Sequence, residues 1–201
     1  MAHNRKKIRG FWSYLLWFFL MSLILASGSP GEDRALLIGV GRYAQLDEKL
    51  NGISLDLQRM TESAQLMGFK RHAIKVLEHE QADSASVYHA VENWLVNGTD
   101  RHDRVLIYFS GHGSQIPDEN NDEDDNFDEV LLLYDATIAQ KHGRQTLHGV
   151  LQDDRFNSML ARMKSRNILV ILDACHSGSA TRSLPLAPRA TLSADIQVKY
   201  Y

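Results

Sequence analysis

The sequence predicts an α/β domain in which helices cover both faces of a mostly parallel sheet. Short, continuous apolar runs of the kind found in buried strands recur along the chain, at 35–40, 105–109, 130–134 and 168–172. Segments with apolar residues at helical spacing separate several of these runs, at 55–67, 84–96 and 153–163. Apolar strands that alternate with amphipathic helices are typical of a parallel sheet that is buried on both sides.

The first half of the domain alternates strand, helix, strand and helix. The run ALLIGV at 35–40 is followed by a helix that ends at Gly68, as a C-cap glycine would end it. A weaker strand at 72–77 comes next. Ser84 can cap the second helix, which the Asn-Gly pair at 97–98 ends.

The second half contains the three strongest strands, VLIYF, VLLLY and ILVIL, none of which includes a charged residue. Asp153 or Asp154 can begin the helix between the last two, because acidic side chains favour a helix N-terminus. After residue 180 the pattern loses its period, and only the final run IQVKYY has the character of a strand.

Length and composition fit one ordinary globular domain. The chain has 201 residues and a mass of 22.8 kDa, with 44% hydrophobic and 23% charged residues, which excludes a disordered chain or a coiled coil. The formal net charge of −3 offers no basic footprint for nucleic acid. The single cysteine, Cys175, excludes a disulfide framework and a Cys-rich zinc site within one chain.

Residues 1–31 predict export of the rest of the chain. A basic cluster from Arg5 to Arg9 precedes the apolar stretch 11–26, and small residues follow at Ala26-Ser27-Gly28. This order is that of a secretory signal peptide. The alternative is an uncleaved membrane anchor, since the stretch approaches the roughly 20 residues that span a bilayer. Either one makes the domain periplasmic, secreted or anchored to the outer face of the membrane.

Reactive side chains follow two of the predicted strands. SGHGS at 110–114 comes directly after VLIYF, and DACHSGS at 173–179 comes directly after ILVIL. Because ligands bind beyond the carboxyl ends of parallel strands, we expect these segments to share one edge of the sheet. A thiolate of Cys175 is a nucleophile, His112 can exchange a proton with it, and the amide of Gly113 can bind an oxyanion.

These motifs resemble those of the caspase-like clan of cysteine peptidases, and specifically a metacaspase of bacterial character. The matching stretches are ALLIGVGRY, LNGISLDLQRM, VLIYFSGHGSQIPD, DEVLLLYD, GVLQDDRF and ILVILDACHSGSATR. The resemblance rests on the SGHG and DACHSGS pair, with His112 and Cys175 63 residues apart. It implies a three-layer α/β/α sandwich with its catalytic large-subunit region at 32–182. An irregular segment follows at 183–201, where the family's small-subunit region would begin.

The resemblance also implies cleavage after Arg or Lys through a Cys175–His112 dyad. Metacaspases have an aspartate, here Asp173, where true caspases have the glutamine of Q-A-C-x-G. Their acidic specificity pocket maps onto Asp173, Ser110 and Asp56, and paired carboxylates favour a guanidinium or ammonium group. Asp56 can instead be a carboxylate that complements a helix N-terminus. The implied partners are protein or peptide substrates with basic residues.

An acidic run predicts either a solvated loop or a site for a hard cation. Residues 118–129 hold eight acids and no base. Metacaspase resemblance implies a calcium site that activates the enzyme, with ligands including Asp128, Asp153 and Asp154, and no other cofactor. The family also takes an aspartate shortly after the cysteine motif, where this chain has Arg182.

Three functions are therefore weighed. The first is a cysteine endopeptidase with an acyl-enzyme on Cys175. The second is a non-catalytic caspase-like binding or regulatory module, which the reduced small-subunit region favours and the intact dyad opposes. The third is a calcium-binding surface protein built around residues 118–129.

Overall fold

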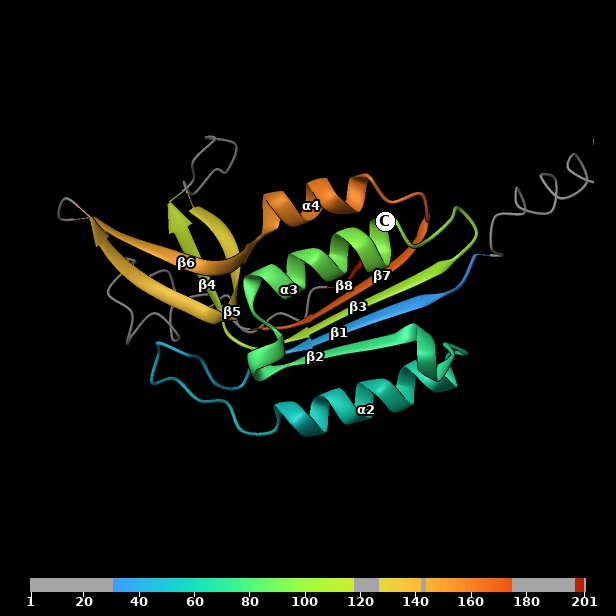
Figure 1. Ribbon diagram of the computed structural model, residues 1–201, viewed down its shortest axis with the longest axis horizontal. Helices are drawn as coiled ribbons and strands as arrows, with labels where there is room; N and C mark the ends of the chain where they lie inside the picture. Colours follow the sequence, from blue (N-terminus) through green and yellow to red (C-terminus); the bar gives the residue numbers. More distant parts are fainter. Residues whose placement is uncertain (1–30, 118–126, 142–143, 175–197, 201) are drawn as a thin grey trace, which may run out of the picture. The chain divides into compact units, whose positions relative to one another are not determined.

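The computed structural model describes residues 31–117, 127–141, 144–174 and 198–200. Residues 32–201 form one compact unit, in which helices lie on both faces of a central five-stranded sheet (Figure 1). Four strands are parallel, and the fifth runs antiparallel at one edge. In spatial order they are β2 (Ile74–Glu78), β1 (Arg34–Gly39), β3 (Arg104–Ser110), β7 (Asn167–Asp173) and β8 (Val198–Tyr200).

The three-layer arrangement follows from the alternation of side chains along the strands. Leu37 and Leu106 pack on one face against α2 (Ile53–Leu66), while Leu36 and Ile107 belong to the core on the opposite face. That second face is covered by α3 (Ser84–His89), η3 (Ala90–Val96) and α4 (Asp153–Ala161). Two short 3-10 helices, η1 (Arg71–Ala73) and η2 (His79–Gln81), flank β2. The predicted α/β class is confirmed.

The N-terminus of α3 differs from the sequence prediction by one residue. The N-cap is Asp83, whose side chain accepts a hydrogen bond from the N–H of Ser86 at 2.6 Å. Ser84 is the first helical residue, and its N–H donates to the Asp135 carboxylate at 2.7 Å. Both residue types cap helices well, so this tertiary contact decides between them.

A second, three-stranded sheet lies beyond the carboxyl ends of the parallel strands (Figure 1). Its strands are antiparallel and follow each other along the chain as β4 (Gly113–Pro117), β5 (Phe127–Lys141) and β6 (Arg144–Gln152). The run at 130–134 is therefore a strand, but the expectation that it joins the parallel sheet was wrong. Only two residues connect β3 to β4, too few for the crossover that a parallel neighbour requires, and β7 occupies the place beside β3.

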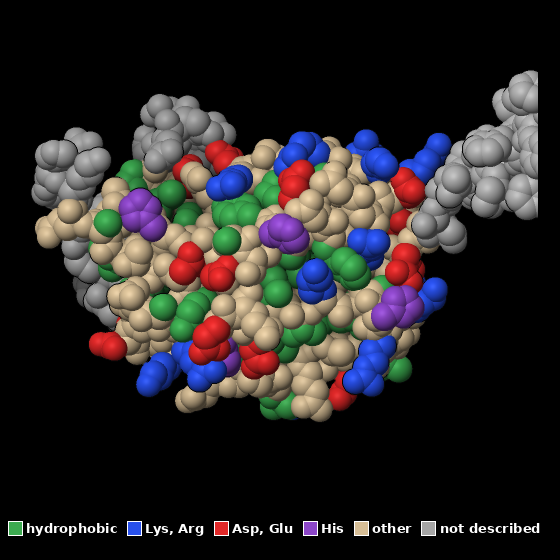
Figure 2. All heavy atoms as spheres, in the orientation of Figure 1, with side chains coloured by type: hydrophobic (Ala, Val, Ile, Leu, Met, Phe, Trp, Pro, Cys, Tyr) green, Lys and Arg blue, Asp and Glu red, His purple; other side chains and the backbone are tan. Residues whose placement is uncertain are grey.

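The predicted signal peptide or anchor at residues 1–31 lies almost wholly outside the described part of the chain. Among the described residues, no helix is long and apolar enough to span a membrane. Of the predicted irregular segment 183–201, only β8 is described, and it lies within the final run that we expected to be a strand. Acidic and basic side chains are interspersed over the face shown in Figure 2.

Candidate active site

The ends of β3 and β7 form the floor of the candidate site. The two strands are adjacent and parallel, and their register pairs Ser110 with Asp173, the last residue of each. The N–H of Gly111 donates to the carbonyl of Asp173 at 3.3 Å, which extends the pairing past the strand ends. The sequence expectation that these two motifs share one sheet edge is confirmed up to Asp173.

His112 and Cys175 each follow this register pair by two positions in the sequence. His112 is described and half-buried. Cys175 lies outside the described residues, which stop at Ala174 and resume at Val198.

The backbone of His112 is held by two different elements. Its carbonyl accepts a hydrogen bond from the N–H of Leu132 on β5 at 2.9 Å. Its N–H donates to the hydroxyl of Tyr43 at 3.1 Å, and the Tyr43 ring stacks on the imidazole with 5.8 Å between centroids and 26° between planes. The histidine is thus held by contacts on the small sheet and on the loop after β1.

The surroundings of His112 favour the neutral form of its imidazole. Burial lowers its pKa below the usual value of 6.5, because a low-dielectric surrounding disfavours the charged ring, and the negative charge of Glu48 partly opposes that shift. Nε2 is buried and has no hydrogen-bond partner within the described part of the chain. A neutral imidazole with a free ring nitrogen can accept a proton.

The Gly113 amide is oriented by the strand pairing. Because Leu132 donates to His112, these two residues form a hydrogen-bonded pair of the antiparallel ladder. Hydrogen-bonded and non-hydrogen-bonded pairs alternate, so the next pair, Gly113 with Leu131, is of the second kind. This turns the N–H of Gly113 away from β5, which is the orientation that the expected oxyanion role requires.

The three residues of the expected acidic pocket all act on the hydroxyl of Tyr108. Asp56 lies in the first turn of α2, Ser110 ends β3, and Tyr108 Oη donates to Oδ2 of Asp173 at 3.4 Å. Burial raises the pKa of Tyr108 to about 12. A hydrogen bond with Ser110 opposes that rise, and the charges of Asp173 and Asp56 add to it. Asp173 therefore contacts this hydroxyl directly, and Asp56 acts on it through its charge.

Sequence reasoning did not single out Tyr43 or Tyr108. In the sequence, Tyr108 is one member of the apolar run VLIYF, and Tyr43 ends the matching stretch ALLIGVGRY. A usable signal existed for both, because a buried tyrosine hydroxyl close to the end of a strand requires a hydrogen-bond partner.

The three candidate calcium ligands lie where β5, β6 and α4 meet. Asp128 is 1% exposed, and its Oδ2 accepts from Nε2 of Gln152 at 2.6 Å. Oδ1 of Asp128 and Oδ1 of Asp153 are buried without a partner in the described regions. Burial raises the pKa of Asp153; a hydrogen bond from the Asp154 backbone opposes this, and the charges of Glu129, Asp154 and Asp128 add to it.

Unpartnered carboxylate oxygens beside other acids have the donor chemistry that Ca²⁺ prefers. Among the described residues, however, no three His, Cys, Asp or Glu side chains converge on a common metal position. Most of the acidic run, 118–126, lies outside the described residues, as does Arg182. The described carboxylates thus match calcium in the type of donor atom, but they do not form a complete coordination shell.

Comparison with known proteins identifies the family. The family model described as "Caspase domain" matches residues 32–196. Metacaspase-1 of Emericella nidulans is 31% identical over 163 residues, which cover 77% of this chain and 38% of that protein. Metacaspase-1A of Aspergillus terreus is 32% identical over 162 residues, with the same coverage of both chains. A crystal structure of a protein from Geobacter sulfurreducens superimposes with a TM-score of 0.56 at 28% identity, covering 76% of this chain and 53% of that one.

The chain therefore belongs to the caspase domain family, and the solved structure from Geobacter sulfurreducens has a similar α/β fold. Its similarity to the fungal metacaspases places it among the metacaspase-type members of that family. It spans less than two-fifths of the length of these curated relatives.

Proposed function

We propose that the chain is a cysteine endopeptidase that cleaves after Arg or Lys through a Cys175–His112 dyad. The observation that supports this most directly is the register of β3 and β7, which pairs Ser110 with Asp173. Each proposed dyad residue follows its strand by two positions in the sequence, and the two strands are adjacent and parallel. In folds of this kind, ligands bind beyond the carboxyl ends of the parallel strands.

The chemistry needs a nucleophile, a proton carrier and an oxyanion donor. The Cys175 thiol gives its proton to Nε2 of His112, and the thiolate attacks the carbonyl carbon of the scissile peptide bond. As the tetrahedral adduct collapses, the carbon–nitrogen bond breaks and the imidazolium donates its proton to the departing amine. Water then adds to the thioester with His112 as base, the carbon–sulfur bond breaks, and the thiol is restored.

Two features of His112 and Gly113 support these roles. The buried, unpartnered Nε2 of His112 can take the thiol proton, and the lowered pKa makes its imidazolium a ready donor to an amine. The amide of Gly113 is turned away from β5 by the strand pairing and can donate to the oxyanion.

The preference for a basic side chain rests on the pocket around Tyr108. The carboxylates of Asp56 and Asp173 both act electrostatically on its hydroxyl. Among the described residues, Asp173 forms no ion pair with a Lys, Arg or His side chain. A guanidinium or ammonium group that entered this pocket would satisfy both acids, whereas an acidic side chain would be repelled.

Calcium activation and export are further parts of the proposal. Bound calcium would neutralise the buried carboxylates of Asp128 and Asp153 and so stabilise the junction of β5 and α4. The N-terminal pattern of residues 1–31 supports a location outside the cytoplasm.

The test is a peptidase assay of the full chain in mild detergent, under reducing conditions, with and without calcium. Fluorogenic peptides with Arg, Lys or Asp before the reporter are compared. We expect cleavage after Arg and Lys that is lost in Cys175→Ala and His112→Gln. The matched control is His148→Gln, because His148 is exposed on β6 and its ring hydrogen-bonds only to Thr146 among the described side chains. Full activity in Cys175→Ala, or cleavage after Asp alone, would contradict the proposal.

A further inference from the structure

The loop between β1 and α2 places one aromatic side chain directly against His112. Tyr43 is the third residue after Val40, and it is 7% exposed. We propose that Tyr43 is a positioning residue that fixes the backbone and the ring plane of His112 for proton transfer. This inference rests on the proposed function, in which His112 is the proton carrier.

The hydroxyl of Tyr43 connects two backbone groups of the site. It accepts the N–H of His112 at 3.1 Å and donates to the carbonyl of Val40 at 3.3 Å. The pairing with β5 satisfies only one of the two backbone groups of His112. Leu132 donates to the His112 carbonyl, whereas the N–H of His112 donates to the hydroxyl of Tyr43. Without the hydroxyl, this N–H would lose its partner, and a buried unpaired donor is costly.

The hydroxyl of Tyr43 holds the backbone of His112, and the ring of Tyr43 restricts the rotation of the imidazole. Its stacking on His112, at 5.8 Å between centroids and 26° between planes, leaves the histidine ring facing an aromatic surface rather than water. Burial raises the pKa of Tyr43 to about 12; the hydrogen bond from the His112 backbone opposes the rise, and the charge of Glu48 adds to it. The phenol therefore stays protonated at every pH at which a thiol peptidase works, and it keeps its donor hydrogen.

Tyr43 can act in this way because its own loop is anchored on both sides. The N–H of Gly41 donates to Nδ1 of His79 at 3.2 Å, and the N–H of Leu50 donates to the carbonyl of Gly41 at 2.8 Å. On the other side, the N–H of Ala44 donates to the carbonyl of Tyr134 on β5 at 2.9 Å. The loop that carries Tyr43 is thus supported by η2 and β5, and such support keeps the geometry of a site precise.

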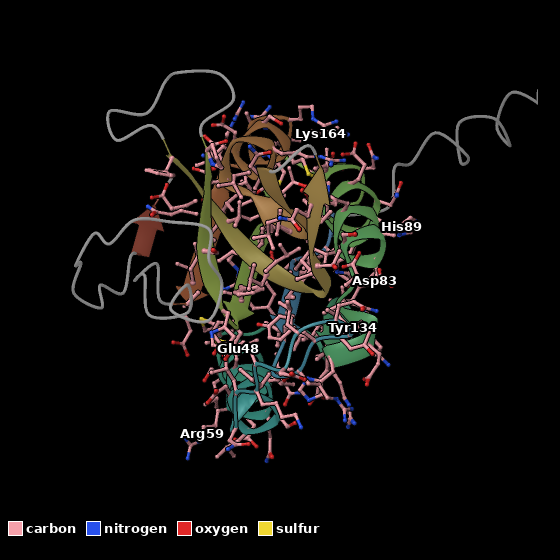
Figure 3. All side chains as sticks on the ribbon, turned by 90° about the vertical axis from the view of Figure 1, so that its left-hand side faces the viewer. Glu48, Arg59, Asp83, His89, Tyr134 and Lys164 are labelled. Carbon is pink, nitrogen blue, oxygen red and sulfur yellow. The ribbon has the colours of Figure 1, made fainter. Side chains whose placement is uncertain are left out.

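The same loop brings Glu48 toward the site. In the view of Figure 3, Glu48 lies between α2 and the small sheet. Its charge acts on both His112 and Tyr43, where it favours the protonated form of each. The loop therefore supplies a stacking ring, a hydroxyl and a charge to the same histidine.

The test compares Tyr43→Phe with a matched control, Tyr88→Phe. Each change removes one hydroxyl that donates to a backbone carbonyl, Val40 for Tyr43 and Val150 for Tyr88 at 3.2 Å. Tyr88 belongs to α3, where its ring lies under the guanidinium of Arg155. The full chain is used, and a third variant, Tyr43→Leu, removes the stacking ring as well. Thermal melts show which variants are folded.

Two readouts are measured on each folded variant. The first is the pair kcat and KM on an Arg peptide. We expect Tyr43→Phe to lower kcat about tenfold with KM nearly unchanged, Tyr43→Leu to lower it further, and Tyr88→Phe to leave both as in the wild type. The second readout, the amide resonance and hydrogen exchange of His112 by NMR, needs no turnover. We expect faster exchange of that amide in Tyr43→Phe only.

The outcomes separate this inference from the proposed function. A kcat and a His112 amide in Tyr43→Phe that match those of Tyr88→Phe would overturn the role of Tyr43. If the wild type cleaves no peptide but the His112 amide changes in Tyr43→Phe alone, the positioning contact stands and the proposed peptidase function fails. An equal loss of kcat in both phenylalanine variants would reduce Tyr43 to a general stabilising residue and would also overturn the inference.

Discussion

Neutralising Asp56 is expected to weaken the preference for arginine. The side chain is half-buried in the first turn of α2, within electrostatic reach of the Tyr108 hydroxyl. A hydrogen bond to a charged group contributes about 1.5–3 kcal/mol, and partial exposure of Asp56 favours the lower end of that range. About 1.5 kcal/mol corresponds to a loss of roughly tenfold in kcat/KM. Steady-state kinetics on Arg and Asp peptides with Asp56→Asn measure this loss.

The matched control for this variant is Glu62→Gln. Glu62 lies on the same helix and loses the same charge, but it is exposed and bonded only to Gln58 among the described contacts. A second effect is independent of turnover: the pKa of Tyr108 should fall below about 12 in Asp56→Asn, because one of the charges that raise it is gone. Equal kcat/KM values for Asp56→Asn and Glu62→Gln on the Arg peptide would refute the assignment of Asp56 to the pocket.

Three further predictions concern stability and protonation. Gly149→Ala should lower the free energy of unfolding by about 2–4 kcal/mol in urea titrations, because φ is +69° and a Cβ would lie 2.4 Å from the Asp135 carbonyl oxygen; an unchanged midpoint would contradict this. The pKa of His112 measured by NMR should lie below 6.5, and it should fall further in Glu48→Gln, because the charge of Glu48 raises it. Since the folded state binds a proton at His112 less readily than the unfolded state, the free energy of unfolding should decrease as the pH falls below 6.5. A pKa above 6.5 would be inconsistent with this account. Because the pKa of Asp153 is raised, its charged form opposes folding at neutral pH, so Asp153→Asn should raise the melting temperature at pH 7 without calcium and remove any calcium-induced rise; a lower melting temperature without calcium would argue against that reading.

The strands of the central sheet were predictable because each is a continuous apolar run. The runs at 35–40, 105–109 and 168–172 became β1, β3 and β7, which are buried between two layers of helices. The run at 130–134 is just as apolar, yet it belongs to the small antiparallel sheet. Hydrophobic periodicity identifies a strand but does not name its partner, and the length of the β3–β4 connection decides that point.

The candidate site also has parts that the sequence predicts and parts that it does not. Placement at strand ends was enough to expect the SGHGS and DACHSGS segments at one edge of the sheet, and the pairing of Ser110 with Asp173 agrees with that expectation. The parts contributed by tyrosine were missed, because Tyr43 and Tyr108 act through hydroxyls whose partners lie 69 and 65 residues away. Such contacts depend on tertiary packing, which no local pattern records.

The central claim is that Cys175 is a nucleophile that depends on His112. Its most direct test is covalent labelling by a peptidyl electrophile ending in Arg, followed by mass spectrometry of the full chain. Because the chain has one cysteine, a single adduct maps to Cys175 without ambiguity. The account predicts rapid labelling that slows at least about a hundredfold in His112→Gln. An adduct that forms equally fast in His112→Gln, or on an electrophile ending in Asp, would contradict it.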